Sequence, residues 1–110
     1  ALQESCKQVY IHPELSKYLV AIIHATRTNG KIACGVSPRG TLAFLRAAQA
    51  YAMVSGRDYV VPEDLKALAV PVLSHRLTMT TGIDSGRATE QVIEEILASL
   101  PVPTENFAVR

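Results

Sequence analysis

The chain has 110 residues, 48% of them hydrophobic, and a formal net charge of +1. This length fits one domain whose modest core needs no disulfide or metal. The small net charge argues against non-specific nucleic-acid binding, and no apolar run approaches the roughly 18 residues of a membrane span. Cys6 and Cys34 form neither a metal-ligand spacing nor a disulfide framework, so we expect two reduced thiols in a cytoplasmic protein.

The N-terminal third of the chain predicts two helices. A short one covers Leu2 to Val9, and an amphipathic one runs from Pro13 to about Arg27. Pro13 suits a first helical position, where the missing N–H costs nothing. Asn29-Gly30 ends the second helix, and residues 31–36 are expected to form a loop or a short extended piece.

The next predicted helix runs from Pro38 to about Ser55 and is rich in alanine, the best helix former. Gly56 is a plausible C-terminal cap, and residues 57–61 are β-prone enough for an isolated bridge. The spacing predicts that one stripe of this helix faces the core: Leu42, Leu45, Ala48, Gln49, Ala52 and Met53.

A third helix is predicted to start at Pro62-Glu63-Asp64. We expect Pro71 to break it near Val70, with a short helix continuing to about Arg76. Leu77 to Arg87 is predicted to be a loop, and the last helix covers Thr89 to Leu100. The sequence therefore predicts an all-α bundle of four main helices.

Residues 34–40 (CGVSPRG) combine a loop, a helix start and an exposed cation. Ser37 is a good N-cap, and Pro38 fits the first helical position. Arg39 then lies in the first turn, where the helix dipole disfavours a cation unless an anion is near. Phosphate is the obvious anion, because helix N-termini and guanidinium groups both bind it. The alternative is an arginine that simply reaches into solvent.

No complete catalytic set is visible. The chain contains no Walker-type Gly-x-x-x-x-Gly-Lys-Ser/Thr sequence. The carboxylate pairs Glu63-Asp64 and Glu94-Glu95 are explained by a helix start or a solvated helix face. The three histidines lack metal-ligand spacing, so no metal site is predicted. The chain alone does not look like an enzyme.

Several separate motifs occur in the order found in one known family. They are residues 35–42 (GVSPRGTL), 56–65 (GRDYVVPEDL) and 71–77 (PVLSHRL). Each resembles the C-terminal lid domain of MoxR-type AAA+ ATPases, as do residues 18–20 and 25–27 upstream. The resemblance implies a four-helix AAA+ lid bundle over residues 1–103, with a short two-strand bridge possible, and a loose tail over 104–110.

The resemblance also implies roles for particular residues. Arg39 matches the sensor-two arginine, a catalytic residue that reaches the nucleotide, and Ser37, Pro38 and Gly40 complete the cofactor-binding set. ATP with Mg²⁺ would bind a longer parent protein, and this chain alone would bind neither tightly. Whether Thr26-Arg27 or His75-Arg76 contact nucleotide or a ring neighbour stays open.

The implied partners are a preceding AAA+ α/β domain, neighbours in a hexameric ring, and proteins with von Willebrand factor A domains, but no nucleic acid. The parent would be a chaperone-like ATPase.

Val61 departs from the family's usual threonine before Pro-Glu-Asp and cannot cap by its side chain. Two alternatives remain: a stand-alone interaction module or histone-fold-like DNA binder, and a lid from a related AAA+ branch such as magnesium chelatase or a replicative helicase.

Overall fold

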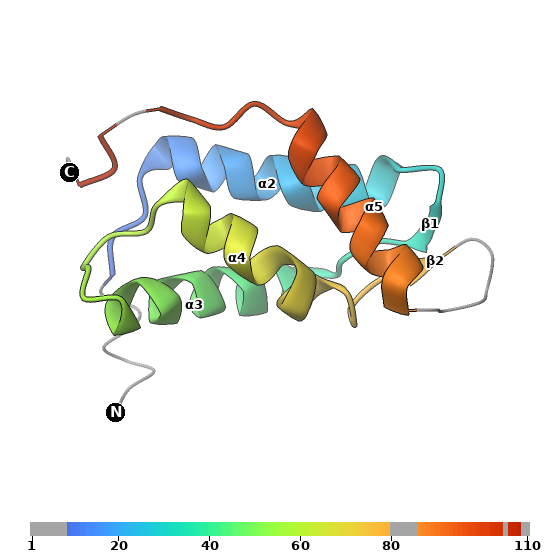
Figure 1. Ribbon diagram of the computed structural model, residues 1–110, viewed down its shortest axis with the longest axis horizontal. Helices are drawn as coiled ribbons and strands as arrows, with labels where there is room; N and C mark the ends of the chain where they lie inside the picture. The colour runs from blue at the N-terminus through green and yellow to red at the C-terminus, as the bar shows by residue number, and fades with distance from the viewer. Residues whose placement is uncertain (1–8, 80–85, 105, 109–110) are drawn as a thin grey trace.

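The computed structural model describes residues 9–79, 86–104 and 106–108. Figure 1 shows four helices around a common core and two short strands at one end of the molecule. In chain order the elements are α2 (Pro13–Thr28), β1 (Ile32–Cys34), α3 (Pro38–Val54), α4 (Pro62–Leu73), β2 (Thr78–Met79) and α5 (Gly86–Ser99). The predicted all-α bundle with a two-strand bridge is confirmed.

The helix predicted from Leu2 lies outside the described residues, apart from Val9. None of the described helices is long and apolar enough to cross a membrane.

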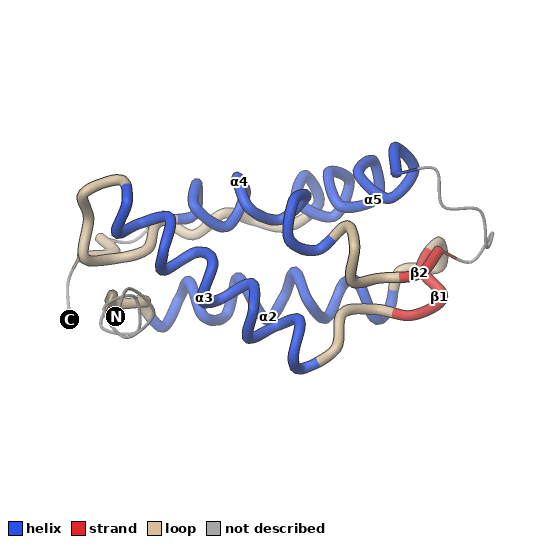
Figure 2. The backbone as a smooth tube through the Cα atoms, turned by 90° about the horizontal axis from the view of Figure 1, so that it is seen from below, coloured by secondary structure: helices blue, strands red, loops and turns tan. Residues whose placement is uncertain are grey.

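The strands β1 and β2 form an antiparallel pair at one end of the helices (Figure 2). Ile32 lies opposite Met79, and both side chains are buried. The loop predicted over Leu77 to Arg87 is therefore wrong at Thr78–Met79, and also at its end, because α5 begins at Gly86. The rest of that prediction, residues 80–85, lies outside the described residues. A two-residue strand has no periodicity that a sequence pattern could reveal.

The core is apolar and draws on every helix. Its largest fully buried hydrophobic side chains are Phe44, Leu15, Ile22, Leu65, Leu73, Ile93, Val36 and Val60. The stripe predicted for α3 needs one correction: Leu42 is 50% exposed, whereas Phe44 is fully buried. In an alanine-rich helix, apolar residues lie on several faces. The large ring of Phe44 removes more apolar area from water than Leu42 would, so it decides which face turns inward.

Pro71 does not break α4, which contradicts the predicted interruption near Val70. The helix is continuous from Pro62 to Leu73, and the Ser74 amide still donates to the Val70 carbonyl at 3.0 Å. Pro71 lies within the last turn and is exposed. A proline so close to the end of a helix removes one backbone hydrogen bond, and its ring displaces nothing from the core.

The turn from α3 to α4 is fixed by backbone hydrogen bonds. Gly56 adopts φ +85°, the left-handed conformation that favours glycine, and caps α3 as predicted. The Gly56 and Arg57 amides donate to the Met53 and Ala52 carbonyls at 3.0 and 2.9 Å. The predicted isolated bridge also forms, between Tyr59 and Tyr10.

Asp64 holds this turn closed from inside. Its carboxylate is 1% exposed and accepts two hydrogen bonds from the Arg57 guanidinium, both at 2.7 Å, and one from the Val61 amide at 2.9 Å. The hydrogen bonds to Asp64 raise the pKa of Arg57 above its ordinary value. Val61 has no side-chain cap hydrogen bond, as its residue type predicts. Asp64 is thus a buried structural carboxylate, not one of a solvated pair.

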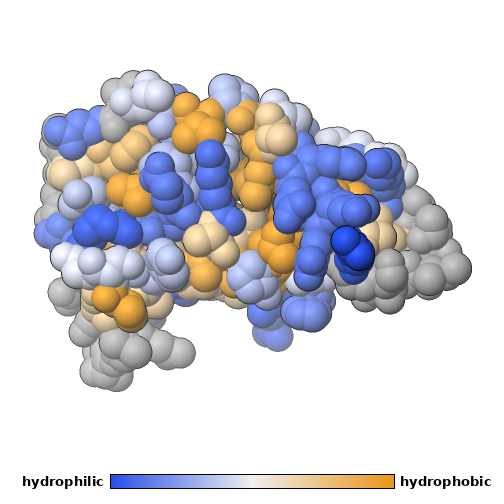
Figure 3. Space-filling view, in the orientation of Figure 1, coloured by the Kyte–Doolittle hydropathy of each residue, from blue (hydrophilic) through white to orange (hydrophobic). Residues whose placement is uncertain are grey.

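The last helix, α5, is amphipathic as predicted. Its buried side chains include Val92, Ile93 and Ile96. Polar side chains cover its outer face, where Figure 3 shows them gathered over α5.

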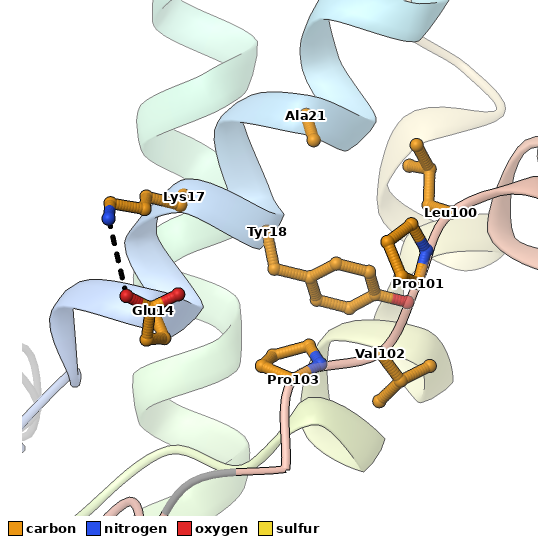
Figure 4. A pocket seen from close by; sticks show the side chains of 8 residues that line it. All are labelled: Glu14, Lys17, Tyr18, Ala21, Leu100, Pro101, Val102 and Pro103. Carbon is orange, nitrogen blue, oxygen red and sulfur yellow. Dashed lines mark hydrogen bonds and ion pairs between the residues drawn. The ribbon is translucent and has the colours of Figure 1, made fainter.

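After α5 the chain turns back along α2 (Figure 1). Together, α2 and residues 100–103 enclose a pocket of about 270 Å³ in which the Tyr18 ring forms one wall (Figure 4). Tyr18 is 4% exposed, and its hydroxyl has no hydrogen-bond partner among the described residues. Further along, Phe107 meets the His12 ring edge-on, with 5.8 Å between ring centroids. The residues predicted as a loose tail therefore make at least this contact.

The Asp64 carboxylate predicts a large stability loss on mutation. Asp64→Asn removes the charge that pairs with a three-quarters-buried Arg57, and breaking such a pair costs about 3 kcal/mol. The matched control is Glu63→Gln, the same change at the exposed neighbouring residue, which we expect to cost about 0.5 kcal/mol or less. Urea denaturation of both variants measures the difference, and equal losses would contradict the structural role of Asp64.

At Tyr18, by contrast, we expect that mutation of the buried hydroxyl causes no loss of stability. Tyr18→Phe removes a buried hydroxyl without a partner, so stability should stay equal or rise by about 1 kcal/mol. Burial and, secondarily, Glu63 raise the pKa of Tyr18. The unfolded chain therefore ionises first, and wild-type stability falls as the pH rises above about 10.

Tyr18→Phe should lose less stability over that alkaline range. Tyr51→Phe, at a residue 43% exposed, is the control and should follow the wild type. Thermal denaturation at pH 7 and pH 10.5 tests both statements, and a loss above 1 kcal/mol at pH 7 in Tyr18→Phe would overturn them.

Candidate functional site

The start of α3 is built as the sequence predicts. Ser37 is the N-cap, and its side-chain oxygen accepts a hydrogen bond from the Gly40 amide at 3.1 Å. Pro38 occupies the first helical position, and the Thr41 amide donates to the Ser37 carbonyl at 2.9 Å. Pro38 has no N–H, and the Arg39 amide has no hydrogen-bond partner among the described residues.

Arg39 projects from this turn into solvent. It is exposed, and no hydrogen bond or ion pair of its side chain occurs within the described part of the chain. The first turn of α3 contains no acidic residue. A guanidinium beside the positive end of a helix dipole therefore has no compensating anion among the residues that the structure describes.

The loop before Ser37 lies against the last turn of α2. The Val36 amide donates to the Thr26 hydroxyl at 3.2 Å, and the Val36 carbonyl accepts from Arg27 Nε at 3.1 Å. Gly35 allows this close approach. A Cβ there would lie 2.8 Å from both the Thr26 carbonyl oxygen and Arg27 Cγ.

A third arginine approaches from the other side of α3. Gly40 is buried, and a Cβ there would lie 2.8 Å from Val36 Cγ1 and 3.1 Å from Arg76 Cδ. The stem of Arg76 thus packs against the first turn of α3 at Gly40, the residue that follows Arg39. Arg27, Arg39 and Arg76 therefore surround one helix start, and none of the ion pairs among the described residues involves them.

Two shallow pockets lie beside α3, one at its first turn and one further along the helix. One, of about 340 Å³, separates α2 from the first turn of α3, and its walls include Arg27, Pro38 and Thr41. The other, of about 530 Å³, lies between α3 and the end of α4, where His75 and Arg76 line it. The structure thus brings Arg27 and Arg76 to the start of α3, whereas His75 lines the pocket beside Ala43 and Ala47, further along the helix.

The four residues predicted to bind a cofactor differ in what they can offer. The Ser37 oxygen already accepts from Gly40, Pro38 has no donor, and Gly40 is buried with its amide engaged. Arg39 is the member of this set that presents a charged donor to solvent. Contact of all four with a nucleotide stays a prediction, with Arg39 as its chemical centre.

Other candidate groups do not gather into a site. No cluster of His, Cys, Asp or Glu that could hold a metal ion occurs among the described residues. Cys34 is exposed and free. The anchoring of Val36 was not apparent from the sequence, because a hydroxyl and a guanidinium bonded to backbone leave no pattern there.

Comparison with known proteins gives a consistent result. A model of the AAA lid domain family matches residues 24–96. The protein YeaC of Bacillus subtilis is 37% identical over 110 residues, which are 99% of this chain and 34% of that protein. Chaperone MoxR1 of Mycobacterium tuberculosis is 34% identical over 115 residues, covering 96% of this chain and 30% of the relative.

A solved structure agrees with these relatives. The crystal structure of a candidate ATPase from Cytophaga hutchinsonii superposes with a TM-score of 0.78 at 30% identity, covering 92% of this chain and 34% of that one. The chain thus spans about a third of the length of the proteins it matches. By family model, relatives and fold, it belongs to the AAA lid domain family and is a lid domain of the MoxR type.

Proposed function

We propose that this lid completes the nucleotide site of an AAA+ ATPase, with Arg39 as its sensor-two arginine. The observation that carries the proposal is the position of Arg39. It is a solvent-exposed guanidinium on a firmly capped helix start, without an anionic partner among the described residues. The missing anion would be a phosphate of ATP held by an adjacent AAA+ α/β domain.

The chemistry of phosphoryl transfer fits such a residue. Catalysis there depends on positioning and on cations that offset charge at the terminal phosphates. Arg39 would offset part of this charge, together with Mg²⁺ bound in the α/β domain. Its contact exists only while the lid and the nucleotide are aligned, so loss of the terminal phosphate would release the lid.

The parent protein would use this movement for chaperone-like remodelling or activation of protein complexes in the cytoplasm. The similarity to Chaperone MoxR1 supports that assignment. Its subunits would form a ring, proposed to be hexameric, in which this lid contacts neighbouring subunits. Proteins with von Willebrand factor A domains are the proposed partners, on the strength of the family resemblance.

The other functions considered have less support. A histone-fold-like DNA binder would need a basic face, whereas the net charge is only +1. A magnesium-chelatase subunit of Guillardia theta is 39% identical, but over 64 residues, which are 56% of this chain. The MoxR-type relative Chaperone MoxR1 is matched over 96%, so the MoxR branch is preferred.

Mutation of Arg39 in the full-length ATPase tests the proposal. Arg39→Ala should lower ATP turnover by about 10³-fold if the guanidinium stabilises transition-state charge as arginine fingers do. The matched control is Arg87→Ala, because Arg87 is also an exposed arginine at the second residue of a helix. Steady-state phosphate release measures both variants.

Unchanged turnover in Arg39→Ala would refute the sensor-two role. The 110-residue chain alone should show no ATPase activity and only weak nucleotide binding by calorimetry. Tight binding to this chain would place the nucleotide site within the lid itself and would also contradict the proposal.

A further inference from the structure

The loop that carries Arg39 is fastened to α2 through a single residue, Val36. Both polar groups of its backbone are bonded to neighbouring residues of α2: the amide to the Thr26 hydroxyl and the carbonyl to Arg27 Nε. Val36 itself is 1% exposed. The bond to Thr26 is buried, so a lost bond there would leave the Val36 amide without a partner in the interior.

Thr26 anchors Val36 through its hydroxyl and not through its shape. It is 1% exposed, donates to the Ile23 carbonyl at 2.6 Å and accepts from the Val36 amide at 3.2 Å. A threonine that bonds back to its own helix normally gains little from doing so. Here the bond to Ile23 fixes the orientation of the Thr26 hydroxyl, so that its oxygen lone pairs face the loop. The hydroxyl oxygen is therefore a fixed acceptor for the Val36 amide.

The fixed position extends from Val36 to Arg39 in two short steps. Ser37 follows directly, and its oxygen holds the Gly40 amide. Pro38 restricts φ between them. The Arg39 Cα is therefore bracketed by an anchor on α2 and a cap on α3, and only its side chain remains free to move.

We propose that Thr26 and Arg27 are positioning residues that set the location of Arg39 relative to α2. This inference rests on the proposed function, because it names what controls that same site. A guanidinium that stabilises a transition state must be held closely, since a displacement of about 1 Å can cost roughly 10²-fold in rate. Without the two bonds at Val36, the start of α3 could shift along α2 while the rest of the core stayed intact.

The decisive variant is Thr26→Val, which keeps the shape of the side chain and removes the hydroxyl. In the full-length ATPase we expect kcat to fall about tenfold, with a smaller change in KM for ATP. Thr26→Ser, which keeps the hydroxyl, should retain most of the wild-type kcat. Thr28→Val is the matched control, because Thr28 makes the same kind of bond, to the His24 carbonyl at 3.2 Å, on the exposed side of the same turn.

A double-mutant cycle separates positioning from simple stability. If Thr26 acts through Arg39, then Thr26→Val in an Arg39→Ala background should change turnover less than about twofold. Hydrogen exchange gives a readout independent of activity: the Val36 amide should exchange faster in Thr26→Val and not in Thr28→Val. Arg27→Lys, which keeps the charge but loses the Nε donor, is the second variant should Thr26→Val fold poorly.

The outcomes distinguish this proposal from the one on which it rests. Full activity in Arg39→Ala would remove the proposed function. A large loss in Arg39→Ala with wild-type kcat in Thr26→Val and Arg27→Lys would overturn only the positioning role. A Thr26→Val effect that persists at full size in the Arg39→Ala background would also overturn it, because the residue would then act on the fold and not on the arginine.

Discussion

A buried carboxylate must be paired where it lies, and the pairing of Asp64 decides how the two central helices meet. Among the described residues it is the one charged side chain that is buried. Its three donors come from Arg57 and the Val61 amide, so all of them belong to the turn between α3 and α4. In this shape the turn satisfies the buried charge, and Phe44 of α3 and Leu65 of α4 share one core.

At the opposite end of α3 a buried polar group also needs a hydrogen-bond partner, but here both groups are neutral. There the buried polar atom is the Thr26 hydroxyl, and the group that needs it is the Val36 amide. Both ends of the helix are thus set by hydrogen bonds that water cannot replace. A helix fixed at both ends moves as one body with the rest of the bundle, which is what a domain must do if it transmits the state of a ligand.

The sequence predicted the helices well because their signals are local. The proline starts at Pro13, Pro38 and Pro62 and the glycine stop at Gly56 act within one turn, and the structure has them as expected. Two of the errors arose where tertiary contacts decide, whereas the error at Pro71 is local, because this proline lies within the last turn of α4. The rotation of α3 depends on which side chain fills the core, and the strand β2 exists only because β1 lies beside it.

For the candidate site, Arg39 and its cap could be found from sequence, since both follow from helix-start chemistry. The anchoring by Thr26 and Arg27 could not, because it joins segments that meet only in the folded chain. The buried role of Asp64 was missed for another reason, because its partners Arg57 and Val61 are close to it in the sequence. Glu63 and Asp64 are both acidic residues in the first turn of a helix, and residue type alone does not show that Asp64 is buried and Glu63 exposed.

The proline before Arg39 has a consequence for binding entropy. Pro38 has few backbone states to lose. Before it the Val36 amide is bonded to Thr26, and after it the Gly40 amide is bonded to Ser37. An anion that reaches this turn therefore meets a backbone ordered in advance. The conformational entropy lost on such contact would be confined to the arginine side chain, which carries about 2 kcal/mol of rotamer freedom, and the loop itself would need no further ordering.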